Sequence, residues 1–388
     1  MKWKKTAVLT VATVTIGLVP PAFAGATGGS GSYWAGMVRE SVTIPMDGGW
    51  SAEGEITYPK GARGRLPILV LLHGSGYNDM DQTLAPGVTT FKTVARTANR
   101  AGFAVLRFNK RGVVGVGPRL SDDPAILDPV KPYEQTVRDA AAAVRFAATA
   151  KRVDPAAVYL LGHSEGTQVA GNLAGDPHAW GITKPAGVIV MGVIDGTPRQ
   201  VIYYQAVGRT LGQLHEEFDV DGNGRLTADE IAHGLIGLPG DAAAQFRAVL
   251  TDPATDTDGD GELAIDTEVE PVVRAAAGFD RFPNLPGLPD RFARYITDIG
   301  RFPAPARDLP HYDGPVLLLN GQTDTQTVVR GAIVADAALA TAGNRDHTLI
   351  TYPGVSHLMN VTPKYRPVPG NPDPAVLRDI TTWLAAHR

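Results

Sequence analysis

The chain has 388 residues, of which 44% are hydrophobic, 7% aromatic and 20% charged, and its formal net charge is −4. This composition is that of one large or two ordinary globular domains, and it excludes collagen, a coiled coil and wholesale disorder. It gives no reason to expect a nucleic-acid partner, because phosphate binding needs a concentrated basic surface. The lack of cysteine excludes disulfides and thiolate chemistry, so any metal must be bound by oxygen or imidazole.

The first 24 residues have the pattern of a secretory signal peptide. Lysines cluster within the first five residues, an apolar run extends from Ala7 to Leu18, and Ala22-Phe23-Ala24 matches an A-x-A cleavage signal. The run is too short for a membrane anchor, which needs about 20 residues. We therefore expect a secreted protein, extracellular or periplasmic, with no stable membrane anchor after cleavage and with a flexible linker over residues 25–36.

The next segments predict a doubly wound α/β domain. Residues 37–44 and 50–58 have strand patterns on either side of a Gly-rich turn, which suits an antiparallel hairpin. Short, nearly continuous apolar runs follow, and these are typical of strands buried on both faces of a parallel sheet. Helical stretches between them fit right-handed crossovers. The expected strands are 66–72, 102–107, 157–162, 187–193, 316–319 and 347–352, and the main expected helices are 90–101, 133–150 and 375–387.

Residues 162–166 read Gly-His-Ser-Glu-Gly, a G-x-S-x-G motif between an apolar strand and a helical segment. In that context the motif is typical of a nucleophile elbow, where a sharp turn holds the serine above the edge of the sheet. A serine hydroxyl is a poor nucleophile at neutral pH and needs a histidine base oriented by a carboxylate. Ser164 is therefore the predicted nucleophile.

Asp324 and His357 are the predicted partners of Ser164. Asp324 comes just after the strand 316–319, and His357 lies in the turn after the strand 347–352. The loops at the carboxyl ends of parallel strands converge, and this fold orders its groups along the chain as serine, acid, histidine. Asp313 is the alternative acid, although it precedes its strand.

The oxyanion of such a reaction needs two backbone N–H donors. The strand 66–72 ends in His73-Gly74-Ser75-Gly76, and the residue after His-Gly is well placed to contribute its amide. We assign the two donors to the amides of Ser75 and Glu165.

These motifs together resemble bacterial α/β-hydrolase esterases of the GHSEG type. The resemblance rests on residues 162–166, on the turn 73–81 and on residues 108–113, where Val114 replaces the glycine that usually ends K-R-G-V-G. It covers residues 37–198 and 311–388. It implies an α/β-hydrolase domain, carboxylic-ester hydrolysis through an acyl-enzyme, a small-molecule ester as substrate, and the same triad and oxyanion residues.

An acidic region of about 110 residues, 200–310, interrupts the α/β alternation. Residues 213–270 hold 15 acidic residues and two arginines, a net charge of −13, whereas the rest of the predicted mature chain sums to +6. Residues 219–230 match an EF-hand calcium loop, with the turn glycine and the glutamate at position 12 in place. Its oxygen ligands would come from Asp219, Asp221, Asn223, Arg225 (carbonyl), Thr227 and Glu230.

A second loop begins at residue 256, and it has three aspartates and the turn glycine but Thr267 at position 12. Threonine cannot supply a bidentate carboxylate, so a weaker site is expected unless the exit helix starts one residue late and brings in Glu268. The expected ligands of this loop are Asp256, Asp258, Asp260 and Glu262 (carbonyl).

The insertion resembles an EF-hand pair over about residues 200–280. Leu226 and Leu263 fall where paired EF-hands form a short β-bridge, and Tyr203 to Phe218 reads as the entering helix. By analogy with other hydrolases, the insertion is expected to form a cap over the nucleophile. Two roles for Ca²⁺ remain open: ordering a cap that admits substrate, or stabilising the folded module.

The sequence therefore predicts a secreted serine esterase with calcium as its only cofactor. The predicted hydrolase domain comprises residues 37–199 and 311–388. Two alternatives stay open: a serine peptidase of the prolyl-oligopeptidase type, which shares the catalytic arrangement, and a catalytically silent calcium-dependent binding protein.

Overall fold

The computed structural model describes residues 33–117 and 119–388. The predicted signal peptide and most of the predicted linker lie outside the described residues. The chain divides into two compact units, which we call the inserted unit (residues 198–297) and the sheet unit (the described residues up to Thr197 and those from Asp298 to Arg388). Among the described helices, none is both long and apolar enough to cross a membrane.

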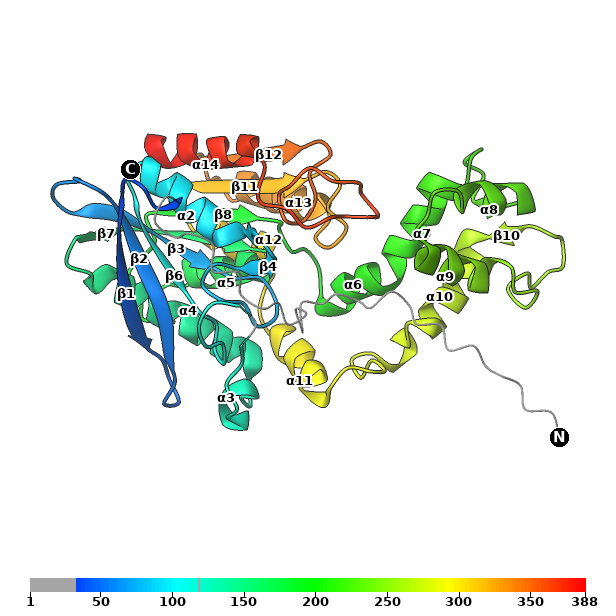
Figure 1. Cartoon of the computed structure of the whole chain (residues 1–388), viewed down its shortest axis with the longest axis horizontal. Helices are drawn as coiled ribbons and strands as arrows, with labels where there is room; N and C mark the ends of the chain where they lie inside the picture. The colour runs from blue at the N-terminus through cyan, green and yellow to red at the C-terminus, as the bar shows by residue number, and fades with distance from the viewer. Residues whose placement is uncertain (1–32, 118) are drawn as a thin grey trace. The chain divides into compact units, whose positions relative to one another are not determined.

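Eight strands form the central sheet of the sheet unit: β1 (Met37–Pro45), β2 (Ser51–Pro59), β3 (Leu66–Leu72), β6 (Ala104–Phe108), β7 (Val153–His163), β8 (Gly187–Met191), β11 (Val316–Gly321) and β12 (His347–Tyr352). Their spatial order is β1-β2-β6-β3-β7-β8-β11-β12 (Figure 1). From β6 to β12 all neighbours pair in parallel, whereas β2 is antiparallel to both β1 and β6. This confirms the predicted doubly wound fold with an antiparallel N-terminal edge.

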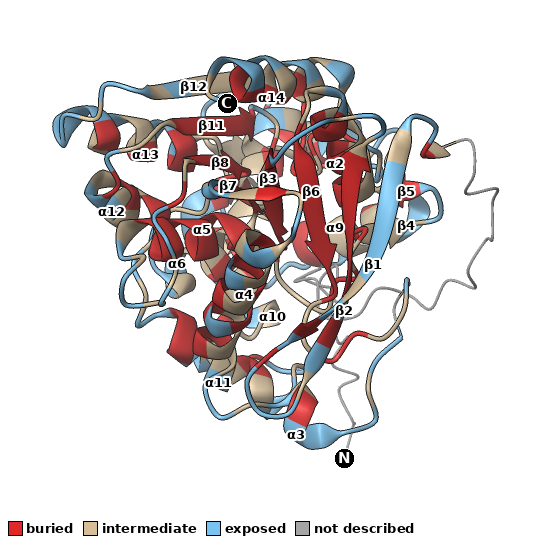
Figure 2. Ribbon diagram, turned by 90° about the vertical axis from the view of Figure 1, so that its left-hand side faces the viewer, coloured by how far each residue is buried: buried red, intermediate tan, exposed pale blue. Residues whose placement is uncertain are grey.

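Helices cover both faces of this sheet, so its inner strands are buried on both sides and are mostly apolar. Strands β6, β8 and β11 are buried throughout, and Figure 2 shows buried strands beneath helices whose outer sides are exposed. Helices α2 (Thr90–Arg100) and α14 (Pro374–Ala386) contact each other and share one hydrophobic core with the sheet. A second group of helices pack one against the next: α4 (Pro132–Thr149), α5 (Glu165–Gly175), α12 (Pro305–Asp308) and α13 (Arg330–Thr341).

The smaller elements of the sheet unit lie in its connections. Strands β4 (Thr83–Ala85) and β5 (Val88–Thr89) form a two-stranded ribbon before α2. Helix α3 (Pro124–Leu127) precedes α4, and a 3₁₀ turn follows α12. Because β3, β7, β11 and β12 run parallel, the loops that leave their carboxyl ends lie at one edge of the sheet.

The inserted unit is mainly helical. Its helices are α6 (Pro198–Tyr203), α7 (Arg209–Gln213), α8 (Ala228–Gly234), α9 (Gly240–Leu250), α10 (Glu270–Ala276) and most of α11 (Asp290–Ile299), with a 3₁₀ turn at Phe279–Arg281. The expected entering helix is a run from α6 to Phe218 that contains two π-helical turns, Tyr204–Gly208 and Leu214–Phe218. Strands β9 (Arg225–Leu226) and β10 (Leu263–Ala264) pair antiparallel, with Leu226 opposite Leu263.

The inserted unit ends earlier than the region 200–310 drawn from the sequence. Residues 298–310 belong to the sheet unit. The Asp298 carboxylate accepts the amides of Tyr133 and Glu134 at 3.0 and 2.9 Å, at the start of α4, and Asn172 of α5 donates to the Pro303 carbonyl at 3.2 Å. These bonds attach residues 298–303, where the chain returns to the sheet unit, to α4 and α5, and no pattern in the sequence indicates such contacts.

Candidate active site

Ser164 lies in a strained turn between β7 and α5. Its φ is 56°, a left-handed conformation that costs a non-glycine residue roughly 1–3 kcal/mol. The flanking glycines make the turn possible, because a Cβ atom on Gly162 would lie 2.0 Å from the Gly166 carbonyl oxygen. A Cβ atom on Gly166 would lie 2.1 Å from the carbonyl oxygen of Leu72, the last residue of β3. The geometry is that of a nucleophile elbow.

The turn after β3 touches this elbow. A Cβ atom on Gly74 would lie 3.2 Å from the Cβ of Ser164. The Asn78 side chain holds the turn, since its Nδ2 donates to the carbonyl oxygens of Gly74 at 3.0 Å and of Ser75 at 2.9 Å. The other predicted oxyanion residue, Glu165, is the first residue of α5, where the helix dipole favours negative charge.

Asp79 fixes the far side of the same turn. Its carboxylate accepts the amides of Asp81 at 3.1 Å, Thr83 at 2.9 Å and Gly117 at 2.6 Å. Its carbonyl oxygen lies 3.0 Å from Nε2 of His73, which therefore donates. Burial lowers the pKa of His73 to about 3, so the ring is neutral and serves as a structural donor.

His357 and Asp324 meet at the ends of β12 and β11. Nδ1 of His357 donates to Oδ2 of Asp324 at 2.9 Å, and both residues are buried. Burial acts to raise the pKa of the Asp324 carboxyl, but His357 and the backbone amides of Thr327 and Gln326 outweigh it, so the pKa is lowered. The carboxylate therefore stays charged and orients the imidazole.

Thr327 completes this pair, and sequence reasoning missed it. Its hydroxyl donates to Oδ2 of Asp324 at 2.8 Å and lies 3.1 Å from Nδ1 of His357. Gly192, which follows β8, leaves room for the arrangement, since a Cβ atom there would lie 3.2 Å from the Thr327 hydroxyl and 3.4 Å from the His357 ring. The alternative acid Asp313 is instead paired with the half-exposed Lys184.

His163 links the elbow to the His357 loop. Its ring centroid lies 4.9 Å from that of His357, and its Nε2 lies 2.9 Å from the His357 carbonyl oxygen. Its Nδ1 lies 2.8 Å from Nε2 of Gln82. Among the described residues, the non-glycine positions with positive φ are Gln82, Ser164 and Met359, and all three lie in or beside this cluster. Backbone strain of this kind concentrates at functional sites.

A family model with the description "Alpha/beta hydrolase family" matches residues 69–365. The chain belongs to the alpha/beta hydrolase family. This alpha/beta hydrolase is 39% identical to Esterase EstD of Thermotoga maritima over 133 residues, which are 34% of this chain and 29% of that relative. The matched part thus spans less than a third of the relative's length.

Solved structures resemble this alpha/beta hydrolase in fold. "Lipase (Open form)" has a TM-score of 0.51 at 16% identity, covering 90% of this chain and 99% of that one. "Bacterial Heroin Esterase" has a TM-score of 0.49 at 16% identity, covering 91% and 85%. The likeness to the lipase shows a common fold.

The inserted unit of this alpha/beta hydrolase carries both predicted cation loops. In the first loop, carboxylate oxygens of Asp219, Asp221 and Glu230 lie within 4.8 Å of one another. Glu230 accepts the amides of Val220 and Thr227, each at 2.9 Å, and the Thr227 backbone N–H is the first cause of its lowered pKa. Further bonds close the loop: Asn223 Oδ1 accepts the Arg225 amide at 2.7 Å, and the Thr227 hydroxyl donates to Glu230 at 2.8 Å.

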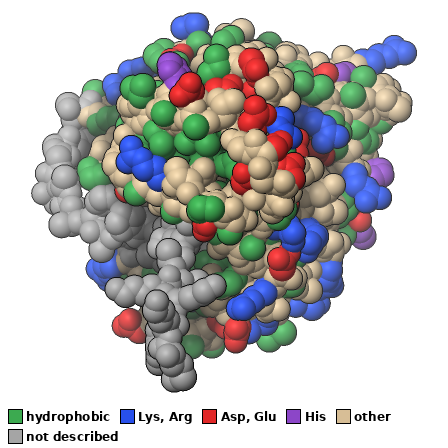
Figure 3. Space-filling view, turned by 90° about the vertical axis from the view of Figure 1, so that its right-hand side faces the viewer, with side chains coloured by type: hydrophobic (Ala, Val, Ile, Leu, Met, Phe, Trp, Pro, Cys, Tyr) green, Lys and Arg blue, Asp and Glu red, His purple; other side chains and the backbone are tan. Residues whose placement is uncertain are grey.

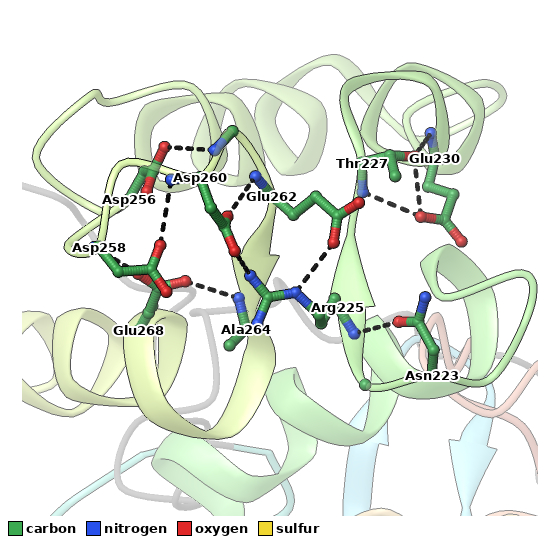
Figure 4. A network of polar contacts seen from close by, with 12 residues as sticks. Asn223, Arg225, Thr227, Glu230, Asp256, Asp258, Asp260, Glu262, Ala264 and Glu268 are labelled. Carbon is green, nitrogen blue, oxygen red and sulfur yellow. Dashed lines mark hydrogen bonds and ion pairs between the residues drawn. The ribbon is translucent and has the colours of Figure 1, made fainter.

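The second loop uses Glu268 in the place of Glu230. Carboxylate oxygens of Asp256, Asp258 and Asp260 lie within 4.8 Å of one another. Glu268 accepts the amides of Thr257 at 2.7 Å and Ala264 at 2.8 Å, at the loop positions that correspond to Val220 and Thr227 (Figure 4). These backbone bonds lower the pKa of Glu268 to about 2.

A π-helical turn, Ile265–Val269, explains how a residue at position 13 occupies this place. A π turn contains one more residue than an α turn. The first turn of the exit helix therefore includes one extra residue, and the side chain at position 13 reaches the place that position 12 occupies in the first loop. The exposed Thr267 is therefore passed over, and the signal in the sequence was the adjacent Thr267-Glu268 pair.

Arg225 joins the two loops. Its backbone lies in β9, and its guanidinium contacts the carboxylates of Asp260 and, at 2.9 Å, Glu262 of the second loop (Figure 4). In the space-filling view, Asp and Glu side chains gather in clusters with Lys and Arg side chains beside them (Figure 3). The arginine partly offsets the repulsion between carboxylates of the two loops.

Proposed function

We propose that this alpha/beta hydrolase is a secreted, calcium-binding serine esterase that cleaves small carboxylic esters through an acyl-enzyme. The observation that carries the proposal is the strained Ser164 elbow, whose neighbour His163 contacts the backbone of a histidine that is itself bonded to a buried aspartate. The esterase named above is the relative that supports an ester as substrate.

The reaction follows from the roles of these side chains. The Ser164 hydroxyl attacks the ester carbonyl while His357 accepts its proton, and the amides of Ser75 and Glu165 bind the negative oxygen. His357 then returns the proton to the departing alcohol. Water attacks the acyl-enzyme with the same proton transfers and releases the acid. Asp324 keeps Nε2 of His357 available and stabilises the imidazolium.

The donor sets of the two loops fit a hard cation. Calcium is bound by about six to eight oxygen ligands, and the first loop offers Asp219, Asp221, Asn223, Thr227, Glu230 and the carbonyl of Arg225. The second offers Asp256, Asp258, Asp260, the carbonyl of Glu262 and, in place of Thr267, Glu268. Bound Ca²⁺ would supply positive charge that neutralises these carboxylates and stabilises the folded unit.

Steady-state hydrolysis of p-nitrophenyl esters tests the enzymatic proposal. Wild-type protein should hydrolyse short acyl esters and leave peptide anilides uncleaved, and S164A should lose at least about 10³-fold in kcat/KM. The exposed Ser51→Ala variant is the matched control and should retain full activity. Preferential cleavage of anilides would support the peptidase alternative, and calcium binding with no hydrolysis would support the binding protein.

Removal of calcium separates its two possible roles. A chelator should lower the melting temperature, because a ligand that binds only the folded form stabilises it by mass action. Initial rates measured well below that temperature show whether calcium also affects access to Ser164. Unchanged rates assign calcium to stability, and reduced rates assign it to substrate admission.

A further inference from the structure

Lys110 connects the two segments that carry the assigned oxyanion amides. Its ammonium donates to the Gly74 carbonyl oxygen and to Oε1 of Glu165, each at 2.9 Å. The Glu165 side chain is fully buried, and that of Lys110 is 14% exposed. An ammonium this far from solvent keeps its bonds in place, because the low-dielectric surroundings strengthen them.

The bond to Gly74 acts directly on the oxyanion donor. The carbonyl of Gly74 and the N–H of Ser75 belong to one planar peptide group and point in opposite directions. A cation on the oxygen therefore fixes the plane of the peptide and polarises its N–H, which becomes a stronger donor. The side-chain amide of Asn78 donates to the same oxygen at 3.0 Å, so two donors hold this peptide against Ser164.

The bond to Glu165 acts on the second donor. Glu165 follows the nucleophile and begins α5, so a fixed side chain restrains the backbone amide of the same residue. Lys110 is itself held, because its backbone N–H donates to the Asn78 carbonyl at 3.0 Å. The ammonium thus ties together the turn after β3, the segment after β6 and the first turn of α5.

We propose that Lys110 is a positioning residue that aligns and polarises the oxyanion hole. This inference rests on the proposed ester hydrolysis. It predicts that loss of the ammonium weakens binding of the transition state more than binding of the substrate. We expect the variant to lower kcat rather than to raise KM, because the oxyanion forms only after attack.

The test compares K110M with wild type on p-nitrophenyl acetate. We expect kcat to fall about 10- to 100-fold, below the loss caused by removing a whole oxyanion donor, with KM changed less than about threefold. Affinity for a trifluoromethyl ketone, which forms an oxyanion on Ser164, should fall in parallel with kcat. The control is K184M, which removes a half-exposed lysine paired with Asp313 and should leave both values unchanged.

K110M alone leaves a buried carboxylate without this ammonium and destabilises the fold. The double variant K110M/E165Q also removes the carboxylate charge, so it tests the loss of the ammonium without that destabilisation. Rates are measured below the unfolding midpoint of each variant. A folded double variant with kcat and ketone affinity within twofold of wild type would overturn the proposal. Absence of ester hydrolysis by the wild type would instead overturn the proposed function itself, and undiminished activity of S164A would overturn Ser164 as its nucleophile.

Discussion

The ring of His163 holds the backbone of His357, because its Nε2 lies 2.9 Å from the His357 carbonyl oxygen. A carbonyl only accepts, so Nε2 carries the proton and Nδ1 accepts from Gln82 at 2.8 Å. The bond from Gln82 requires a neutral imidazole, because Nδ1 can accept only when it carries no proton, and burial lowers the pKa of His163 to about 3. The residue before the proposed nucleophile thus positions the loop of the proposed base.

This neutral histidine makes folding sensitive to acid. The pKa falls from an ordinary value of 6.5 in the unfolded chain to about 3 in the folded protein. The unfolded chain therefore binds the extra proton between these values, and the free energy of unfolding decreases as pH falls from 6.5 towards 3. Above 6.5 both states are neutral and the effect vanishes. The loss per histidine is about 1.4 kcal/mol for each pH unit.

Urea unfolding of H163N between pH 6 and 4 checks this prediction. The slope of the free energy of unfolding against pH should be smaller than in wild type by about 1.4 kcal/mol per pH unit, which corresponds to one proton fewer taken up on unfolding. The exposed His178→Asn variant controls for the loss of a histidine side chain as such. A slope in H163N equal to that of wild type would show that His163 is not held neutral.

Gly192→Ala should separate activity from stability. Its φ of +68° strains alanine by about 1 kcal/mol, and the new Cβ would press on Thr327 at 3.2 Å and His357 at 3.4 Å. We expect kcat to fall about tenfold or more, because small displacements of catalytic groups are costly. Gly343→Ala shares the positive φ, +83°, with nothing within 4 Å, and should lose stability alone. Equal kcat in the two variants would refute the contact argument.

Gly166→Ala should strongly destabilise the fold. The new Cβ would lie 2.1 Å from the Leu72 carbonyl oxygen, a backbone atom that cannot move aside, so we expect a loss of more than about 3 kcal/mol. Gly171→Ala is the control in the same helix, since its nearest neighbour would lie 3.5 Å away. It should gain about 0.5–1 kcal/mol from the better helix former. Soluble, fully stable Gly166→Ala protein would contradict the close packing of the elbow on β3.

Isothermal titration with Ca²⁺ tests which residue completes the second loop. Wild type should bind two ions, and E268Q should lose about tenfold or more in affinity at one of them, because a carboxylate oxygen is replaced by an amide. T267A is the matched control, since Thr267 is exposed and lies beside Glu268 in the chain. It should bind as wild type does. The reverse pattern would restore position 12 as the ligand position.

Strong local signals explain what the sequence predicted well. The nearly continuous apolar run 66–72 gave a strand with the bounds that the structure has, and the short strand predicted over residues 347–352, before the His357 turn, also has the observed bounds. Strand β7 begins at Val153, four residues before the predicted start, because its pairing with β3 shifts register between Leu66 and Ile68, so that Val153 also pairs with β3. Hydrophobic periodicity does not report such an irregularity.

The supporting residues of the site lay beyond sequence reasoning. Thr327, Gln82 and Lys110 act through contacts with residues 30, 81 and 55 positions away in the chain. No local pattern distinguishes Thr327 and Gln82 from ordinary polar residues of a loop, and Lys110 stands in the K-R-G-V segment 110–113 without any sign there of its contact with Glu165. Glu268 was visible only as a neighbour of position 12, since the π turn that brings it into the loop has no sequence signature of its own.

Intact-mass spectrometry after treatment with a fluorophosphonate tests whether Ser164 is the nucleophile. We expect a single adduct per chain, located on Ser164 by peptide mapping, with loss of esterase activity in proportion to labelling. S164A protein should take up no label. Label on another residue, or full ester hydrolysis by fully labelled protein, would contradict Ser164 as the nucleophile.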